Sequence, residues 1–309
     1  MSIMNSLLLQ ASVATFAVGS TLLWAAPPES PRAFSSPQVA AQALIDAAAR
    51  NDTAALLELL GPGGKDIVQS GDPADDKAVR AAFAARARAR LQVEKSRDIP
   101  NRAIMIVGPE NWRFPVPLIL KNRRWYFDAA QGRLEILAWR ISRDEIAAID
   151  VCRAYVEAQM QYASRDRNAH GMLEYAQEIV NSPGKKDGLY DKGEPEALVP
   201  KSFADAATVM LRSQGNTPVP YHGYFFHILK SQGPEAPGGA GDYVANGEMI
   251  GGFALVAWPA EYGISGVQTL IVSHLGIVYE NDLGSQTAIL ARQMSRFNPD
   301  KSWKPVTGE

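Results

Sequence analysis

The sequence has little cysteine and little histidine. Among its 309 residues there is one cysteine, Cys152, and there are four histidines. A single thiol excludes an intramolecular disulfide and any zinc site built from several cysteines. No His-Glu-x-x-His pattern occurs either, so the usual local zinc motif is absent. Because Cys152 lies in a helical pattern beside Ile149 and Val156, we expect it to be a small buried hydrophobe.

The chain also lacks a strong charge of either sign. Its 31 basic and 33 acidic side chains leave a formal net charge of -2. Such a balance provides no broad positive field for nucleic acid or for anionic lipid. We therefore expect no nucleic-acid partner, and contact with a membrane only through the N-terminal segment if that segment is retained.

The third absence is charge at the N-terminus, where no ionisable side chain precedes Glu29. The stretch from Leu7 to Ala26 is mostly apolar, which is typical of a signal peptide or a short membrane anchor. We predict that residues 1–26 direct export and that residues 27–35 form a Pro/Ser-rich linker. The expected location is periplasmic or otherwise extracytoplasmic. Release after cleavage and anchoring in the inner membrane both remain open.

What the chain does contain is ordinary globular composition, with 46% hydrophobic and 21% charged residues. Its length favours two domains. In residues 36–141, helical patterns come first and strand patterns follow from Ala103, with a hairpin around 121–124. This order predicts an α+β domain in which helices back a curved antiparallel sheet, an arrangement that resembles the NTF2-like and cystatin-like folds.

Residues 142–309 are predicted to form a second α+β domain. Ser142 and Glu145 have the spacing of a capping box, which predicts a helix from Ser142 to about Ala163. A short helix is expected at 173–180, and strands at 224–229, 249–258, 268–272 and 277–279. The apolar stripe that should bury the long helix consists of Ile146, Ile149, Cys152, Val156 and Met160.

Several motifs, in order along the chain, resemble one bacterial family, the domain-of-unknown-function family numbered 2950. They lie at Trp112–Pro117, Trp125–Asp128, Asp166–Gly171, Pro183–Tyr190, Pro220–Phe226, Met249–Leu255 and Pro259–Gly263. The resemblance covers roughly Phe34 to Val306 and implies an envelope protein without known catalytic residues. The long helix and the later hairpins, at 266–271 and 276–279, also resemble the globular part of pilins and pseudopilins, which implies a similar fold for the C-terminal half.

One segment has the spacing of a calcium loop. Asp166, Asn168, His170 and Glu174 stand at positions one, three, five and nine, with Gly171 at the turn position. His170 offers nitrogen where a hard cation needs oxygen, and Gln177 cannot supply a bidentate carboxylate at position twelve. We favour the alternative, in which the segment is a polar turn without metal. We expect no other cofactor, and at most weak calcium binding here.

The candidate ligand site combines aromatic residues, one histidine and a glycine pair. Adjacent glycines in an apolar strand suggest the close approach of a backbone or a ligand, or else a bulge or bend. We assign the site to Tyr221, His222, Tyr224, Gly251, Gly252 and Tyr262. The predicted function is non-catalytic binding of a partner protein or a small ligand in the envelope. The alternative is a periplasmic enzyme, a hydrolase, with its site near His222 and Tyr224.

Overall fold

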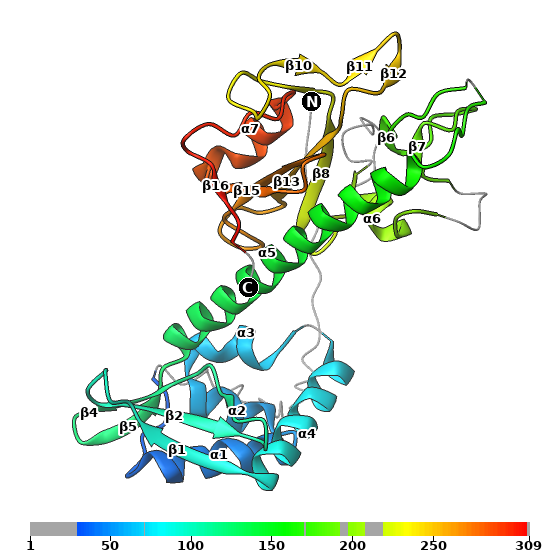
Figure 1. Cartoon of the computed structure of the whole chain (residues 1–309). Helices are drawn as coiled ribbons and strands as arrows, with labels where there is room; N and C mark the ends of the chain where they lie inside the picture. Colours follow the sequence, from blue (N-terminus) through cyan, green and yellow to red (C-terminus); the bar gives the residue numbers. More distant parts are fainter. Residues whose placement is uncertain (1–29, 71, 170, 192–196, 208–218, 308–309) are drawn as a thin grey trace, which may run out of the picture. The chain divides into compact units, whose positions relative to one another are not determined.

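The computed structural model describes residues 30–70, 72–169, 171–191, 197–207 and 219–307. The chain forms two compact units that divide between Ala130 and Gln131. Both combine helices with mainly antiparallel sheets, so the α+β class is confirmed (Figure 1). The predicted export segment, residues 1–26, lies outside the described residues. Within the described ranges, no helix is both long enough and apolar enough to cross a bilayer.

The N-terminal unit begins with helices and ends with a sheet. Each of its three longer helices starts at a side-chain cap, Ser36, Asp52 or Asp72, whose oxygen accepts a backbone N–H of the first turn. The helices are α1 (Pro37–Ala49), α2 (Thr53–Leu60), α3 (Lys65–Val68) and α4 (Pro73–Ala89), with a 3-10 turn, η1 (Pro62–Gly64), after α2. The strands are β1 (Leu91–Lys95), β2 (Arg102–Val107), β3 (Trp112–Arg113), β4 (Leu118–Lys121) and β5 (Arg124–Phe127).

The sheet of this unit runs in the order β1-β2-β4-β5, all antiparallel, with β3 paired to β2. The predicted hairpin around 121–124 is the β4–β5 pair. The expected linker is partly wrong, because Phe34 is buried and exchanges both backbone hydrogen bonds with Trp125, at 2.8 and 2.9 Å. Pairing with an otherwise open strand edge satisfies these backbone groups and fixes the chain there.

The long helix is α5 (Ala129–Tyr162), so the predicted start at Ser142 is wrong. Residues 129–141 contain no proline and several strong helix formers, so nothing stops the helix from beginning earlier. Ser142 lies exposed inside it. The Glu145 carboxylate does not close a capping box either, since it accepts the backbone N–H groups of Val267 and Gln268 at 2.8 and 3.0 Å.

The buried face of α5 agrees only in part with the predicted stripe, of which Ile149, Cys152 and Val156 pack against the core of the C-terminal unit. Ile146 and Met160 are exposed, at 58% and 45% of their surface. The core of the C-terminal unit is faced by residues spaced mostly three and four apart, which include Ala148, Cys152, Tyr155, Gln159 and Tyr162. Cys152 is fully buried, as predicted, and burial raises the pKa of its thiol to about 12, so the reactive thiolate is suppressed.

The main sheet of the C-terminal unit has the order β16-β15-β14-β13-β8, all antiparallel. Its central strands are almost entirely apolar, as expected for strands covered on both faces. The strands are β8 (Tyr224–Leu229), β13 (Ala254–Pro259), β14 (Thr269–Ser273), β15 (Val278–Asn281) and β16 (Lys304–Pro305). Helix α7 (Thr287–Gln293) follows the 3-10 turn η3 (Gly284–Gln286) and contacts β13, and α6 (Lys201–Ala207) contacts β8.

Small strand pairs surround this sheet, and one of them overturns the short helix predicted at 173–180. They are β6 (Glu178–Val180) with β7 (Gly188–Tyr190), β9 (Ser231–Gln232) with β10 (Gly241–Asp242), and β11 (Val244–Ala245) with β12 (Glu248–Met249). The segment before β6 is extended because Tyr175 pairs with Met249 and the side-chain amide of Gln159 holds both backbone groups of Ala176 at 2.8 Å. These tertiary hydrogen bonds replace the helical ones.

Candidate functional site

The predicted aromatic site begins in a tight turn rather than in a strand. Tyr221 and Tyr224 exchange backbone hydrogen bonds, and His222 and Gly223 between them have φ of 48° and 74°. Positive φ at both central residues is typical of a two-residue hairpin turn. The buried Tyr224 hydroxyl donates to the carbonyl oxygen of Gln268 at 2.9 Å. Burial, and then the nearby Glu145 carboxylate, raise the pKa of Tyr224, so this hydroxyl is a fixed structural donor.

The glycine pair lies at the other end of the same strands. Tyr224 is paired with Pro259, whereas Ala254, just after Gly252, is paired with Leu229. The two ends are five residues apart, or about 16 Å along the strand. The structure therefore does not bring Gly251 and Gly252 together with Tyr221, His222 and Tyr224.

The close approach expected at the glycines does occur, but with other parts of the same chain. Gly252 has φ of 136°, and a Cβ there would lie 2.6 Å from Nδ1 of His274 and 3.0 Å from the Tyr243 ring. A Cβ on Gly251 would lie 2.8 Å from the carbonyl oxygen of Asp242. Tyr262, the remaining predicted residue, is 37% exposed, and its hydroxyl donates to Asp282 at 3.0 Å.

Of the two histidines near the predicted site, His222 lies in the turn and His227 lies on β8. In the described part of the chain, no hydrogen bond or ion pair joins His222 or His227 to a carboxylate. His227 is half-buried on β8, and burial lowers the pKa of its imidazole, which keeps the ring neutral.

The predicted calcium loop is closed by its own hydrogen bonds. The Asp166 carboxylate accepts the backbone N–H of Gly171 at 2.7 Å, and the Asn168 side-chain amide donates to Glu174. Gln177, expected at the last position, donates instead to the Gly247 carbonyl oxygen at 2.6 Å. His170 lies outside the described residues. Among those that are described, no three His, Cys, Asp or Glu side chains are grouped to hold a metal ion.

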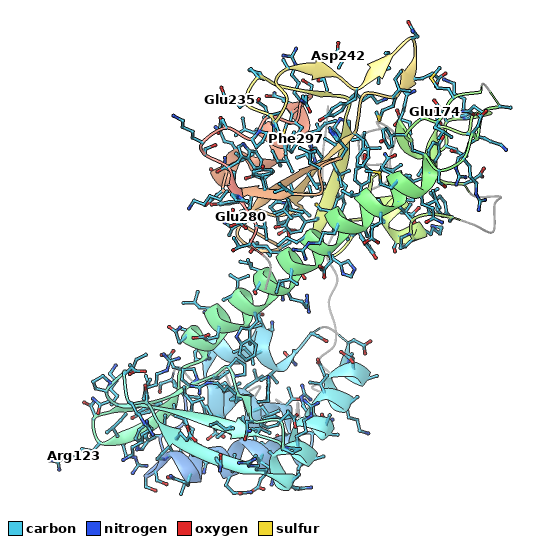
Figure 2. All side chains as sticks on the ribbon, viewed as in Figure 1. Arg123, Glu174, Glu235, Asp242, Glu280 and Phe297 are labelled. Atoms are coloured by element: carbon cyan, nitrogen blue, oxygen red, sulfur yellow. The ribbon has the colours of Figure 1, made fainter. Side chains whose placement is uncertain are left out.

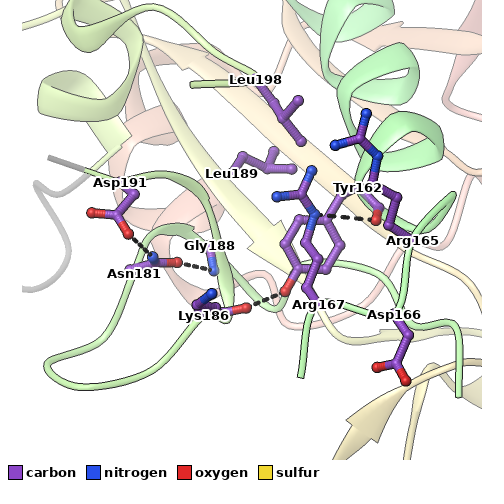
Figure 3. A pocket seen from close by; sticks show the side chains of 10 residues that line it. All are labelled: Tyr162, Arg165, Asp166, Arg167, Asn181, Lys186, Gly188, Leu189, Asp191 and Leu198. Atoms are coloured by element: carbon purple, nitrogen blue, oxygen red, sulfur yellow. Dashed lines mark hydrogen bonds between the residues drawn. The ribbon is translucent and has the colours of Figure 1, made fainter. Parts of the chain in front are cut away.

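A polar pocket of about 280 Å³ lies at the C-terminal end of α5, in the C-terminal unit. It is built by the end of α5 and the segment that follows it, by the loop between β6 and β7, and by β7 with the residues after it (Figure 3). Its lining residues are Tyr162, Arg165, Asp166, Arg167, Asn181, Lys186, Gly188, Leu189, Asp191 and Leu198. We call it the polar pocket.

Tyr162 and Arg167 fix one wall of the polar pocket. The Arg167 guanidinium lies 4.9 Å from the centroid of the Tyr162 ring, and its Nε donates to the Tyr162 carbonyl oxygen at 3.3 Å. An aromatic face attracts a cation, so the guanidinium is held in one orientation. The Tyr162 hydroxyl donates to the carbonyl oxygen of Lys186. Burial, with the Glu174 carboxylate nearby, raises the pKa of Tyr162 to about 12, so the hydroxyl keeps its proton at neutral pH.

The loop opposite this wall is fixed by its own side chains. Asn181 accepts the backbone N–H of Gly188 at 2.7 Å, and Asp187 accepts that of Ser182 at 2.8 Å. Gly188 must be glycine, because a Cβ there would lie 2.4 Å from the backbone nitrogen of Asn181. The loop therefore presents Lys186 on a constrained backbone.

The side chains that line the polar pocket carry more positive than negative charge. Three cations line it, Arg165, Arg167 and Lys186. Its two carboxylates already accept hydrogen bonds from the protein, Asp166 from the Gly171 backbone and Asp191 from the Asn181 side chain at 3.0 Å. In Figure 3 the Asp166 carboxylate is directed away from the Tyr162 ring. Guanidinium groups match carboxylate and phosphate oxygens in geometry as well as charge.

Comparison with known proteins places nearly the whole described chain in one family. A family model described as a protein of unknown function, DUF2950, matches residues 31–306. The chain belongs to this family. The resemblance found in the sequence motifs is thereby confirmed, whereas the pilin resemblance gains no such support. No curated protein and no solved structure matches the chain.

Sequence reasoning missed the polar pocket, although the motifs of the DUF2950 family pass through it. Asp166–Gly171 and Pro183–Tyr190 both contribute lining residues. The available signal was two basic clusters, Arg165 with Arg167 and Lys185 with Lys186, after the tyrosine that ends a long helix. Only the fold shows that these clusters face one another.

Proposed function

We propose that the protein is an exported binding protein of the bacterial envelope, which holds a small anionic molecule in the polar pocket. The ligand chemistry is a carboxylate or a phosphate ester. The observation that carries this proposal is the Arg167 guanidinium, held on the Tyr162 ring inside a pocket with two further cations. A cation whose orientation is fixed before binding loses less conformational entropy when a ligand arrives.

The size of the polar pocket favours a small ligand. Its volume of about 280 Å³ is just below the range of roughly 300–1,000 Å³ that is typical of ligand sites. Leu189 and Leu198 supply a limited apolar wall beside the cations. A compact acid with a short carbon skeleton fits this balance better than a long chain or a folded protein surface.

Export and the finer fold assignments remain part of the proposal. The uncharged stretch before Glu29 supports translocation, and binding in the envelope follows from it. The helix-first order of residues 36–130 supports an NTF2-like or cystatin-like arrangement, and α5 with the later sheet supports a pilin-like one.

The test is calorimetric titration of the full chain with inorganic phosphate, succinate and citrate. We expect Arg167→Met to weaken binding roughly tenfold, as for a lost hydrogen bond to a charged group. The affinity of Arg167→Lys should lie between those of the natural chain and Arg167→Met, because lysine keeps the charge but lacks the planar guanidinium fork. Arg153→Met is the matched control, since Arg153 is an exposed arginine of α5 paired with Asp150 at 3.3 Å. Equal affinity in Arg167→Met and Arg153→Met would refute the assignment.

A further inference from the structure

A second hollow, of about 460 Å³, lies within the N-terminal unit. It runs beside the β4–β5 hairpin and is bounded by the end of α2, the turn after it and the first residues of α5. Its accessible apolar surface comes from Pro62, Ile119 and Tyr126, while Leu60 and Phe127, which also line it, are almost fully buried. We call it the hairpin hollow.

The strand register explains why apolar groups line the hairpin hollow. Ile119 and Tyr126 are cross-strand partners, and Leu118 and Phe127 are the adjacent pair. Successive side chains point to opposite faces of a sheet, so the two pairs lie on different faces. Leu118 and Phe127 are buried in the core of the unit, whereas Ile119 and Tyr126 are only half-buried. An isoleucine and a tyrosine on the outer face thus keep apolar surface open to a ligand.

The two ends of the hairpin hollow carry opposite charges. Lys121 lies at the turn end, paired with Arg124, and Asp128 follows the last residue of β5 at the other end. Asp128 is four positions after Arg124, which corresponds to about 13 Å of extended chain.

The turn itself adds positive charge. Asn122 and Arg123 have φ of 52° and 61°, and an arginine in this left-handed region is unfavourable where glycine would be free of strain. Arg123 projects from the tip of the hairpin (Figure 2).

We infer that the hairpin hollow binds an elongated monocarboxylate with an unbranched apolar body, the carboxylate at Lys121 and the chain along Ile119 and Tyr126. The lysine attracts the carboxylate of the ligand, and contact of its hydrocarbon chain with the apolar wall favours binding because it removes hydrocarbon from water. Asp128 opposes a second carboxylate at the far end, so the site distinguishes monoacids from diacids of the same length. This inference rests on the N-terminal unit alone and is independent of the proposed function in the polar pocket.

The test is calorimetric titration of the full chain with three eight-carbon ligands: octanoate, octanedioate and 8-aminooctanoate. Octanoate should bind, and octanedioate should bind at least about fivefold more weakly, because its second carboxylate meets Asp128. 8-Aminooctanoate should bind more strongly than octanedioate, because an ammonium group replaces the second carboxylate that Asp128 opposes. Equal binding of octanoate and octanedioate would overturn the orientation.

Two substitutions locate the binding. Lys121→Gln should weaken octanoate roughly fivefold, a factor that corresponds to about 1 kcal/mol. Ala130→Trp places a large ring at an exposed lining position and should abolish binding without disturbing the core. Lys95→Gln, at an exposed position of β1, is the control for charge. Arg167→Met should leave octanoate binding unchanged, which separates this site from the polar pocket. Absence of octanoate binding at millimolar concentration, or binding that neither Lys121→Gln nor Ala130→Trp alters, would refute the inference.

Discussion

The two candidate sites differ because different kinds of element build them. The hairpin hollow lies against two strands, whose outward side chains Ile119 and Tyr126 make it apolar. The polar pocket lies among loops after α5, where side chains such as Asn181 and Asp187 hydrogen-bond the backbone and leave little apolar surface. A sheet face selects a ligand by buried area, whereas a hydrogen-bonded loop selects it by charge and direction.

The cores of the two units differ in a similar way. The core of the N-terminal unit consists largely of alanine and leucine from α1 and α2, with few aromatic rings. The C-terminal unit buries many aromatic side chains, among them Trp258, Tyr155 and Phe226. A large ring gains more from burial and leaves a larger cavity when it is removed. The two units should therefore respond differently to truncation of a core side chain.

The largest expected effect is the loss of Trp258, which is fully buried on β13. Trp258→Ala should lower the free energy of unfolding of the C-terminal unit by about 3–5 kcal/mol. Leu44→Ala, in the core of the N-terminal unit, should cost about 2–5 kcal/mol there. Native-state hydrogen exchange measures both, with α1 and β13 as reporters. Equal loss of protection in both units after either substitution would show one cooperative unit and break the comparison.

A middle-sized effect concerns the glycine turn of the C-terminal unit. Gly252→Ala should destabilise the C-terminal unit by roughly 2 kcal/mol, because the new Cβ would press on His274 and the φ of 136° is strained for alanine. Gly276 is the matched control. Its φ is 77° and a Cβ there would meet no atom within 4 Å, so alanine should cost only about 1 kcal/mol. Thermal unfolding of the two variants measures the difference, and equal melting temperatures would contradict the steric argument.

The smallest effect tests how the polar pocket is held. Tyr162→Phe removes the donor to the Lys186 carbonyl oxygen and should cost about 1 kcal/mol at neutral pH. The natural chain should then lose stability as pH rises from about 10 to about 12. Its folded tyrosine, with a pKa raised to about 12, keeps a proton that the unfolded tyrosine releases near pH 10. Denaturant unfolding at pH 8 and pH 11 checks the sign. If Tyr162→Phe lowered the free energy of unfolding as much at pH 11 as at pH 8, this pH dependence would be refuted.

Much of the local structure could be predicted from the sequence. Ser36 and Asp52 start helices because their side chains satisfy N–H groups of the first turn, whatever the rest of the fold does. The β4–β5 hairpin was predictable from apolar runs on either side of a polar turn. A single thiol in a helical pattern was enough to predict the buried Cys152. These features depend on neighbours a few residues away.

The tertiary structure decided the remainder, because distant partners compete with local preference. The pattern of residues 173–177 predicts a helix, yet Gln159 and Met249 take the hydrogen bonds of Tyr175 and Ala176. Ser142 and Glu145 have the spacing of a cap, but Glu145 binds the backbone of Val267 and Gln268 instead. The polar pocket likewise depends on contacts between distant segments. Its basic clusters stand about twenty residues apart in sequence, and only the β6–β7 loop brings Lys186 opposite Arg167.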